Sequence, residues 1–193
     1  MKLTVNEIFY SLQGEGGRSG EASIFIRLTK CNLACSFCDT DFADGNDMTL
    51  EEILDVIKEF SCKWIIWTGG EPTIQLRDEH LAFFRDHGYK QAIETNGTRP
   101  VPSLIDYITC SPKQKYESIK LRIPKVNEIR MPIAVGDEIP DISVLPPADN
   151  YFLSPIFDAD KINIENVNHC VELIKQYPEW RLSLQIHKLI HIE

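Results

Sequence analysis

The apolar residues of this chain fall into short continuous runs, and these runs alternate with segments of helical spacing. Short apolar runs predict strands, which we expect at residues 3–10, 24–28, 64–67, 92–93, 107–110, 151–153 and 181–184. Because strands and helices alternate, the pattern predicts an α/β fold with mostly parallel strands. The chain has few helices for its strands, so we expect a reduced, open partial (β/α) barrel rather than a closed one.

Three segments carry apolar residues at the spacing of an amphipathic helix. The first opens at Thr49, which can form a capping box with Glu52, and the second covers about 77–87 and ends at Gly88. The third covers about 164–176 and is expected to place four residues on one face: Ile164, Val167, Val171 and Ile174. Residues 115–150 contain several prolines, which predict a loop with at most a short strand at 128–130.

Three of the predicted strands end in polar or glycine-rich segments. These segments are TGGEP at residues 68–72, ETNGT at residues 94–98 and SPK at residues 111–113. Parallel α/β sheets place their ligands at the carboxyl ends of the strands. We therefore expect a binding site at this edge of the sheet.

Composition and charge describe a globular protein of acidic character. The 193 residues carry 20 Lys and Arg against 29 Asp and Glu, a net charge of −9, and we expect one domain over residues 1–193. The acidic balance disfavours nucleic-acid binding. No apolar run approaches the roughly 18 residues of a membrane span, and the first residues lack the apolar run of a secretory signal. We therefore expect a cytoplasmic protein whose cysteines stay reduced.

Three of the six cysteines lie within eight residues, at Cys31, Cys35 and Cys38. Thiolates are the ligands of iron–sulfur clusters, and three local cysteines on a cubane leave its fourth iron open to a substrate or cofactor. A zinc site with a histidine or a distant cysteine as fourth ligand is the alternative, but the sequence shows no second tight pair of ligands. The other cysteines lie in apolar segments and are expected to be buried without a ligand role: Cys62, Cys110 and Cys170.

The CxxxCxxC spacing resembles the signature of the radical S-adenosylmethionine (SAM) superfamily. In that superfamily a strand tip like Gly69-Gly70-Glu71-Pro72 contacts the amino group of SAM, and glycines let backbone carbonyls approach this ammonium closely. Further segments resemble one family, 7-carboxy-7-deazaguanine synthase: SLQGEG at 11–16, CDT at 38–40, ETNGT at 94–98, SPK at 111–113 and SLQIHK at 183–188. The resemblance extends over nearly the whole chain in sequence order.

The resemblance implies a lyase that performs a radical ring contraction. Members of the family convert 6-carboxy-5,6,7,8-tetrahydropterin to 7-carboxy-7-deazaguanine with loss of ammonia, on the route to queuosine and related deazapurines. A reduced 4Fe-4S cluster cleaves SAM, the 5′-deoxyadenosyl radical takes a hydrogen from C6 of the pterin, and SAM is regenerated. The radical arises at the cluster and SAM, so we expect no catalytic side chain. The family also uses Mg2+.

The resemblance also implies a role for each residue of these motifs. The 4Fe-4S ligands would be Cys31, Cys35 and Cys38, and the Mg2+ ligand would be Thr40. SAM would contact Phe37, Cys38, Asp39, Gly70, Glu71, Ser111, Pro112, Lys113 and Gln185. The pterin substrate would contact Leu12, Gln13, Gly14, Glu15, Arg27, Thr68 and His187.

Several of these roles also have an ordinary structural explanation. The guanidinium of Arg27 suits a substrate carboxylate, yet this residue also fits a solvent-facing position on a strand. Glu15 could accept the N–H donors of a pterin edge or simply belong to a polar hairpin. Glu94 or Asn96 could bind the SAM ribose, but Asn-Gly also forms turns. Thr40 would need substrate oxygens and waters to complete a Mg2+ site.

The partners and the rival functions follow from the same comparison. The resemblance implies a homodimer, and radical chemistry of this kind needs an electron donor such as flavodoxin or ferredoxin. The C-terminal end closes over the pterin in this family, but Glu193 differs from the smaller end expected, so we assign it no contact. Two other functions stay open, an activase that installs a glycyl radical on a partner enzyme and a zinc-bearing interaction module. The Gln13-Gly14-Glu15 segment, Arg27 and Thr40 argue against the activase.

Overall fold

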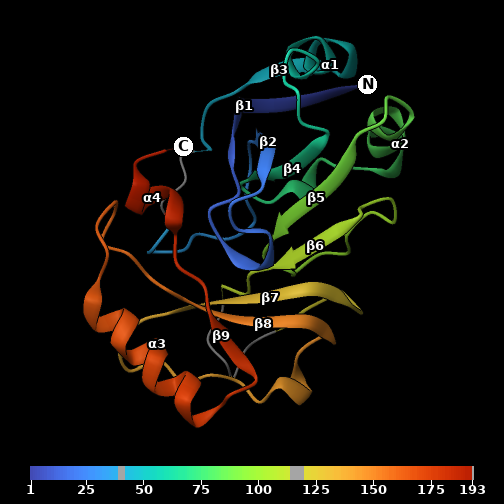
Figure 1. Cartoon of the computed structure of the whole chain (residues 1–193). Helices are drawn as coiled ribbons and strands as arrows, with labels where there is room; N and C mark the ends of the chain where they lie inside the picture. The colour runs from blue at the N-terminus through green and yellow to red at the C-terminus, as the bar shows by residue number, and fades with distance from the viewer. Residues whose placement is uncertain (39–41, 114–119, 193) are drawn as a thin grey trace. The chain divides into compact units, whose positions relative to one another are not determined.

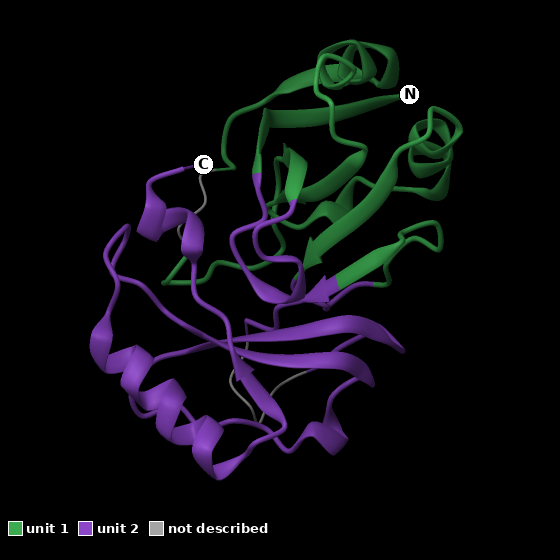
Figure 2. Cartoon of the chain, in the orientation of Figure 1, with its two compact units in different colours: residues 1–11, 22–95, 100–108 green, residues 12–21, 96–99, 109–193 purple. Residues whose placement is uncertain are grey.

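The computed structural model describes residues 1–38, 42–113 and 120–192. The chain divides into two compact units (Figure 2). Unit 1 comprises residues 1–11, 22–95 and 100–108, and unit 2 comprises residues 12–21, 96–99 and 109–193. A single domain over residues 1–193 stays a prediction.

The sheet of unit 1 has the strand order β3-β1-β2-β4-β5 (Figure 1). The strands are β1 (Lys2–Leu12), β2 (Ala22–Leu28), β3 (Asn46–Thr49), β4 (Trp64–Gly69) and β5 (Lys90–Thr95). β3 runs antiparallel to β1, whereas β2 and β5 each run parallel to β4. The carboxyl ends of β2, β4 and β5 therefore lie at the same edge, as the sequence predicts.

Both helices of unit 1 begin and end where local chemistry favours it. α1 (Leu50–Ile57) starts with the predicted capping box, in which Glu52 N donates to Thr49 Oγ1 at 3.1 Å and Thr49 N donates to Glu52 Oε2 at 2.7 Å. A 3-10 turn, η2 (Pro72–Ile74), and α2 (Asp78–Asp86) join β4 to β5. Gly88 follows α2 with a φ of 80°, a conformation that suits glycine at the end of a helix.

The core of unit 1 joins the sheet to both helices. α1 contributes Leu50, Ile53 and Ile57, which are buried together with apolar residues of the strands. Trp67 of β4 packs edge-on against Phe84 of α2, with ring centroids 5.4 Å apart. Because each fully buried apolar side chain stabilises the fold by roughly 1.5–3 kcal/mol, this core is the main source of stability for the unit.

Unit 2 has the strand order β6-β7-β8-β9, and each neighbouring pair is parallel. The strands are β6 (Tyr107–Cys110), which begins in unit 1, β7 (Val126–Ile133), β8 (Ala148–Pro155) and β9 (Trp180–Leu182). The other elements are η1 (Gly16–Arg18), η4 (Ile142–Val144), α3 (Ile164–Gln176) and α4 (Ile186–Ile190). α3 links β8 to β9 and lies along both strands (Figure 1).

The structure corrects the predicted face of α3. The helix has the predicted bounds, but Ile164 is 59% exposed, and the residues buried on this helix are Asn166 and Cys170. Burial of Asn166 is offset by hydrogen bonds at both ends of its amide group: its Nδ2 donates to Ile156 O at 2.7 Å and its Oδ1 accepts from Val135 N at 2.9 Å. A polar residue whose hydrogen bonds are satisfied can therefore replace an apolar one on the inner face.

The structure also adds elements that the sequence did not predict. β7 is longer than the short strand expected at 128–130, β3 lies where no strand was predicted, and α4 follows β9. The two sets of strands are open, because β3 is an edge strand of unit 1 and β9 an edge strand of unit 2. The predicted open, mostly parallel α/β fold is confirmed. Within the described ranges, no helix is long and apolar enough to cross a membrane.

We predict that Ile53→Ala lowers the free energy of unfolding by about 2–5 kcal/mol, because Ile53 is fully buried and truncation leaves a cavity. Val56→Ala is the matched control in the same helix, since Val56 is 39% exposed and its truncation should change stability by only about 0.5 kcal/mol. Urea denaturation of both variants measures the difference. Equal losses would show that α1 does not pack as described.

Candidate functional site

The cysteine loop of unit 1 begins against the tip of β4. β2 and β4 are in register so that Leu28 lies beside Gly69. Beyond these strands, Gly70 N donates to Leu28 O at 3.0 Å and Glu71 N donates to Lys30 O at 2.8 Å. The residues that lead into Cys31 are therefore hydrogen-bonded to the Gly-Gly-Glu segment that follows β4.

The two glycines of this tip are required by the close passage of that backbone. A Cβ on Gly69 would overlap the carbonyl oxygen of Leu28, and a Cβ on Gly70 would overlap that of Lys30. Gly69 also has a φ of 115°, which side chains rarely adopt. The sequence predicts that these glycines leave room for SAM, and the structure gives them a second purpose, which is to admit the backbone that enters the cysteine loop.

The cysteine loop has the donor set that an iron–sulfur cluster needs. Cys31 and Cys35 are partly exposed, Cys38 is exposed, and none of them is in a disulfide. In the described ranges, no three His, Cys, Asp or Glu side chains converge as ligands of one metal ion. A cubane does not need such convergence, because each cysteine binds a different iron. Three accessible thiols in one short loop therefore fit the cluster.

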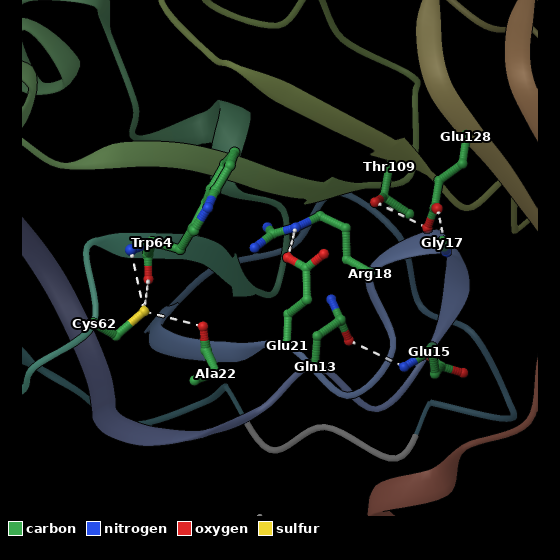
Figure 3. Close-up of polar contacts among 10 residues, drawn as sticks. All are labelled: Gln13, Glu15, Gly17, Arg18, Glu21, Ala22, Cys62, Trp64, Thr109 and Glu128. Atoms are coloured by element: carbon green, nitrogen blue, oxygen red, sulfur yellow. Dashed lines mark hydrogen bonds and ion pairs between the residues drawn. The ribbon is translucent and has the colours of Figure 1, made fainter.

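The remaining cysteines have different surroundings. Cys110 and Cys170 are fully buried, and desolvation raises the pKa of the Cys170 thiol to about 12. Cys62 is only partly buried, and its Sγ donates to Ala22 O at 3.0 Å (Figure 3). A thiol that stays protonated at neutral pH is a poor metal ligand, so Cys170 fits the structural role expected for it.

Glu71 is buried and bonded within unit 1. Its Oε1 accepts from Thr73 N at 3.1 Å, from Thr73 Oγ1 at 2.6 Å and from Thr95 Oγ1 at 2.8 Å. The carboxylate thus ties the tip of β4 to η2 and to the end of β5. A contribution of its charge to SAM binding stays a prediction. Thr73 was missed from the sequence, and Thr95 was given no role although it lies in the segment at 94–98, because a single hydroxyl near a strand end carries no recognisable signal.

Arg27 and Thr68 occupy neighbouring positions in the sheet of unit 1. The two residues are register partners on β2 and β4, and both are partly exposed. The Nε of Arg27 lies 2.5 Å from Glu7 Oε1, and its guanidinium lies 5.6 Å from the ring centroid of Phe9. The structure therefore brings two of the predicted substrate residues together and shows that Glu7 and Phe9 hold the arginine.

Three residues discussed from the sequence fall outside the described ranges. Asp39, predicted for SAM, and Thr40, predicted for Mg2+, fall outside the described residues, as does Glu193. Phe37, predicted for SAM, is 36% exposed at the surface of the cysteine loop.

In unit 2, the predicted substrate segment forms a tight hairpin. Leu12 is 38% exposed, whereas Gln13 is buried and its Oε1 accepts from Glu15 N at 3.2 Å (Figure 3). Glu15 Oε2 lies 3.0 Å from Arg130 Nη1, and Glu15 Oε1 accepts from Ser154 Oγ at 3.1 Å. The side chain of Glu15 is therefore fixed in place by β7 and β8.

The segment after β9 packs on the same hairpin. Ile186 N donates to Gly14 O at 2.9 Å, and a Cβ on Gly14 would overlap the ring of His187. Gln185, predicted for SAM, immediately precedes α4. The structure thus brings His187 and Gly14 together, and contact of both with one ligand stays a prediction.

The tips of β5 and β6 also contribute to unit 2. Asn96 Oδ1 accepts from Thr98 N at 3.0 Å and from Thr98 Oγ1 at 2.6 Å, which is the turn expected as the ordinary role of Asn-Gly. After β6, Lys113 Nζ donates to Ser111 Oγ at 2.8 Å, and Pro112 between them is buried. Contact of Ser111, Pro112 and Lys113 with SAM stays a prediction.

The sequence missed the polar residues of β7 and β8. Glu128, Arg130 and Ser154 are buried and contact the hairpin, although residues 115–150 were given no role. Alternation of charged and apolar residues normally marks a strand with one solvated face. The hairpin covers that face here, which no local pattern reveals.

Comparison with known proteins identifies the superfamily and the relatives of this chain. Residues 25–113 match the model of the radical SAM superfamily, a range that holds the cysteine loop and the tip of β4. The chain is 43% identical over 192 residues to 7-carboxy-7-deazaguanine synthase of Bacteroides thetaiotaomicron, with 100% of both chains covered. It is 44% identical over 203 residues to the enzyme of that name from Haemophilus influenzae, covering 99% of this chain and 94% of the relative.

A solved structure agrees with these relatives. The crystal structure of QueE from Escherichia coli is similar with a TM-score of 0.73 and 26% identity, covering 97% of this chain and 95% of that one. Neither the relatives nor this structure favour a glycyl-radical activase. The chain belongs to the 7-carboxy-7-deazaguanine synthase family of the radical SAM superfamily.

Proposed function

We propose that this chain converts 6-carboxy-5,6,7,8-tetrahydropterin to 7-carboxy-7-deazaguanine with loss of ammonia. The proposal is carried by the cysteine loop, which is bonded to the carboxyl tip of β4 in a chain 43% identical over its whole length to a synthase of that name. The reaction belongs to queuosine and deazapurine biosynthesis, and the protein acts as a lyase.

The cysteine loop, the tip of β4 and the segment after β6 would hold the radical-generating group. Cys31, Cys35 and Cys38 bind three irons of a 4Fe-4S cluster, which together with SAM supplies a 5′-deoxyadenosyl radical when both are bound. The backbone at Gly70 and the segment Ser111-Pro112-Lys113 bind SAM. Glu71 keeps the tip of β4 in shape through Thr73 and Thr95.

Binding of the pterin uses complementary charge and hydrogen bonds. Arg27 binds the substrate carboxylate through its Nη groups, while Glu7 retains the Nε and keeps the guanidinium oriented. Glu15 accepts N–H donors of the pterin ring, and its side chain is held for this purpose by Arg130 and Ser154. Thr68, next to Arg27 in register, adds a hydroxyl.

The remaining parts of the proposal concern the ion, the partners and the location. Thr40 would bind Mg2+, and substrate oxygens and waters would supply its other ligands. An electron donor such as flavodoxin or ferredoxin reduces the cluster, and the chain works as a homodimer in the cytoplasm. It binds neither nucleic acid nor a membrane.

Anaerobically reconstituted protein should bind about four irons per chain, show a broad brown absorbance and form 7-carboxy-7-deazaguanine from the reduced pterin. Mass spectrometry of the product and metal analysis test both parts. Bound zinc without colour would support the interaction module instead. Iron, colour and SAM cleavage without the deazaguanine would retain the radical SAM assignment and reject the pterin as substrate.

Cys35→Ala should lose most of its iron and reduce SAM cleavage to background, because removal of one of three thiolates leaves the cluster labile. Cys62→Ser is the matched control, since its hydroxyl can keep the hydrogen bond to Ala22 O and it is not a predicted ligand. Iron per chain and the visible spectrum distinguish the two variants. Full iron content in Cys35→Ala would remove this residue from the ligand set.

Gly70→Ala should bind less iron than wild type, because its Cβ would displace the backbone at Lys30 that leads into Cys31. Gly88→Ala provides the control, since its Cβ meets open space and its positive φ costs only about 1 kcal/mol of stability. Iron content and denaturation midpoints are measured for both. Normal iron content in Gly70→Ala would mean that the loop does not depend on this close passage.

A further inference from the structure

β7 carries two buried residues of opposite charge in its interior. Glu128 is 2% exposed and Arg130 is 5% exposed, and as residues two apart on one strand they point to the same face of the sheet. Burial of a charge is unfavourable unless the charge is paired and hydrogen-bonded. The partners of these two residues therefore indicate what the charges are for.

Both charges are paired with the hairpin formed by residues 13–21. Glu128 Oε2 accepts from Gly17 N at 2.8 Å, and its Oε1 accepts from Thr109 Oγ1 at 3.2 Å (Figure 3). Arg130 Nη1 lies 3.0 Å from Glu15 Oε2. Glu128 thus holds the backbone amide of Gly17, and Arg130 holds the side chain of Glu15.

The fit between Glu128 and the hairpin leaves no space for a side chain. Gly16 has a φ of 70°, and a Cβ at this position would overlap the Glu128 carboxylate. Gly16 N in turn donates to Ser183 Oγ at 2.9 Å, and Ser183 is itself buried. The turn at Gly16 and Gly17 is therefore fixed by two amide hydrogen bonds to side chains far away in the sequence.

We propose that Glu128 and Arg130 are positioning residues that fix the hairpin so that Glu15 presents its carboxylate to the substrate. The proposal rests on the proposed function, because it takes the pterin as the molecule that Glu15 binds. Glu128 acts through the backbone of Gly17, and Arg130 acts through the side chain of Glu15. Neither residue contacts the substrate.

The contacts point to positioning rather than to general stability. Apart from the bond from Thr109 Oγ1 to Glu128, they all converge on the hairpin of residues 13–21. The side chain of Glu15 is 18% exposed, whereas that of Arg130 is 6% exposed. The buried arginine therefore holds the carboxylate while part of it stays accessible to solvent. Loss of Glu128 should loosen the hairpin before it unfolds the protein.

Glu128→Gln tests the proposal because it keeps the shape and removes the charge. The control is Glu172→Gln, which removes an exposed carboxylate from α3 that pairs only with Lys175 among the partners described for it. We expect faster amide hydrogen exchange in residues 13–21 of Glu128→Gln, with unchanged exchange in α1 and β4. We also expect the KM for the pterin to rise about tenfold or more while SAM cleavage without pterin stays at the wild-type rate.

Ser183→Ala is a milder second variant, in case Glu128→Gln folds poorly. It removes the acceptor of Gly16 N without leaving a buried charge unpaired, and it should produce the same pattern to a smaller extent. Unchanged exchange of the hairpin in both variants would overturn the proposal. So would a parallel loss of SAM cleavage, pterin turnover and stability, which would mark a purely structural role.

The proposed function can fail separately from this inference. If wild-type protein cleaves SAM but does not turn over the pterin, the proposed substrate is wrong. The hydrogen-exchange comparison uses no substrate, so it still decides whether Glu128 fixes the hairpin.

Discussion

The close passage of one backbone segment over two glycines determines how unit 1 presents its cysteines. Residues 28–31 run so near to Gly69 and Gly70 that neither position can carry a Cβ. Two hydrogen bonds, from Gly70 N and Glu71 N, hold the segment there. Because the parallel pairing of β2 and β4 sets the register of this contact, the position of Cys31 follows from the sheet itself. The cysteine loop thus begins from backbone that is hydrogen-bonded to the tip of β4.

Most of the fold could be predicted because its elements carry strong local signals. The capping box of Thr49 and Glu52 marks the start of α1, and the apolar run at residues 64–67 marks a strand covered on both faces. β3 and α4 lacked such signals, since one is a short polar edge strand and the other has only five residues. Ile164 was assigned to the wrong face of α3 because periodicity treats Asn166 as polar, whereas its satisfied amide makes it a core residue.

The residues of the candidate site also differ in how well the sequence reveals them. The cysteines, the two glycines and the segment Gln13-Gly14-Glu15 each lie within a few residues of sequence, so their spacing alone suggests their chemistry. Their supports are not contiguous: Thr95 reaches Glu71 from the next strand, and Arg130 reaches Glu15 across more than a hundred residues. A single charged residue in a strand gives no sign that another segment will cover it. Sequence motifs therefore identify the groups that touch ligands better than the groups that hold them.

Glu71, which is buried, and Glu15, which is partly buried, illustrate two ways to stabilise a carboxylate that is withdrawn from water. Glu71 is surrounded by a backbone N–H and two hydroxyl groups, which satisfy the oxygen they share and leave the acid inside the protein. Glu15 is instead paired with a cation that is more deeply buried than itself. An acid held in this way remains partly exposed, so it can still accept hydrogen bonds from a ligand. The hydrogen-bond partners of Glu71 thus suit a carboxylate that shapes the backbone, whereas the pairing of Glu15 with Arg130 suits one that can bind a ligand.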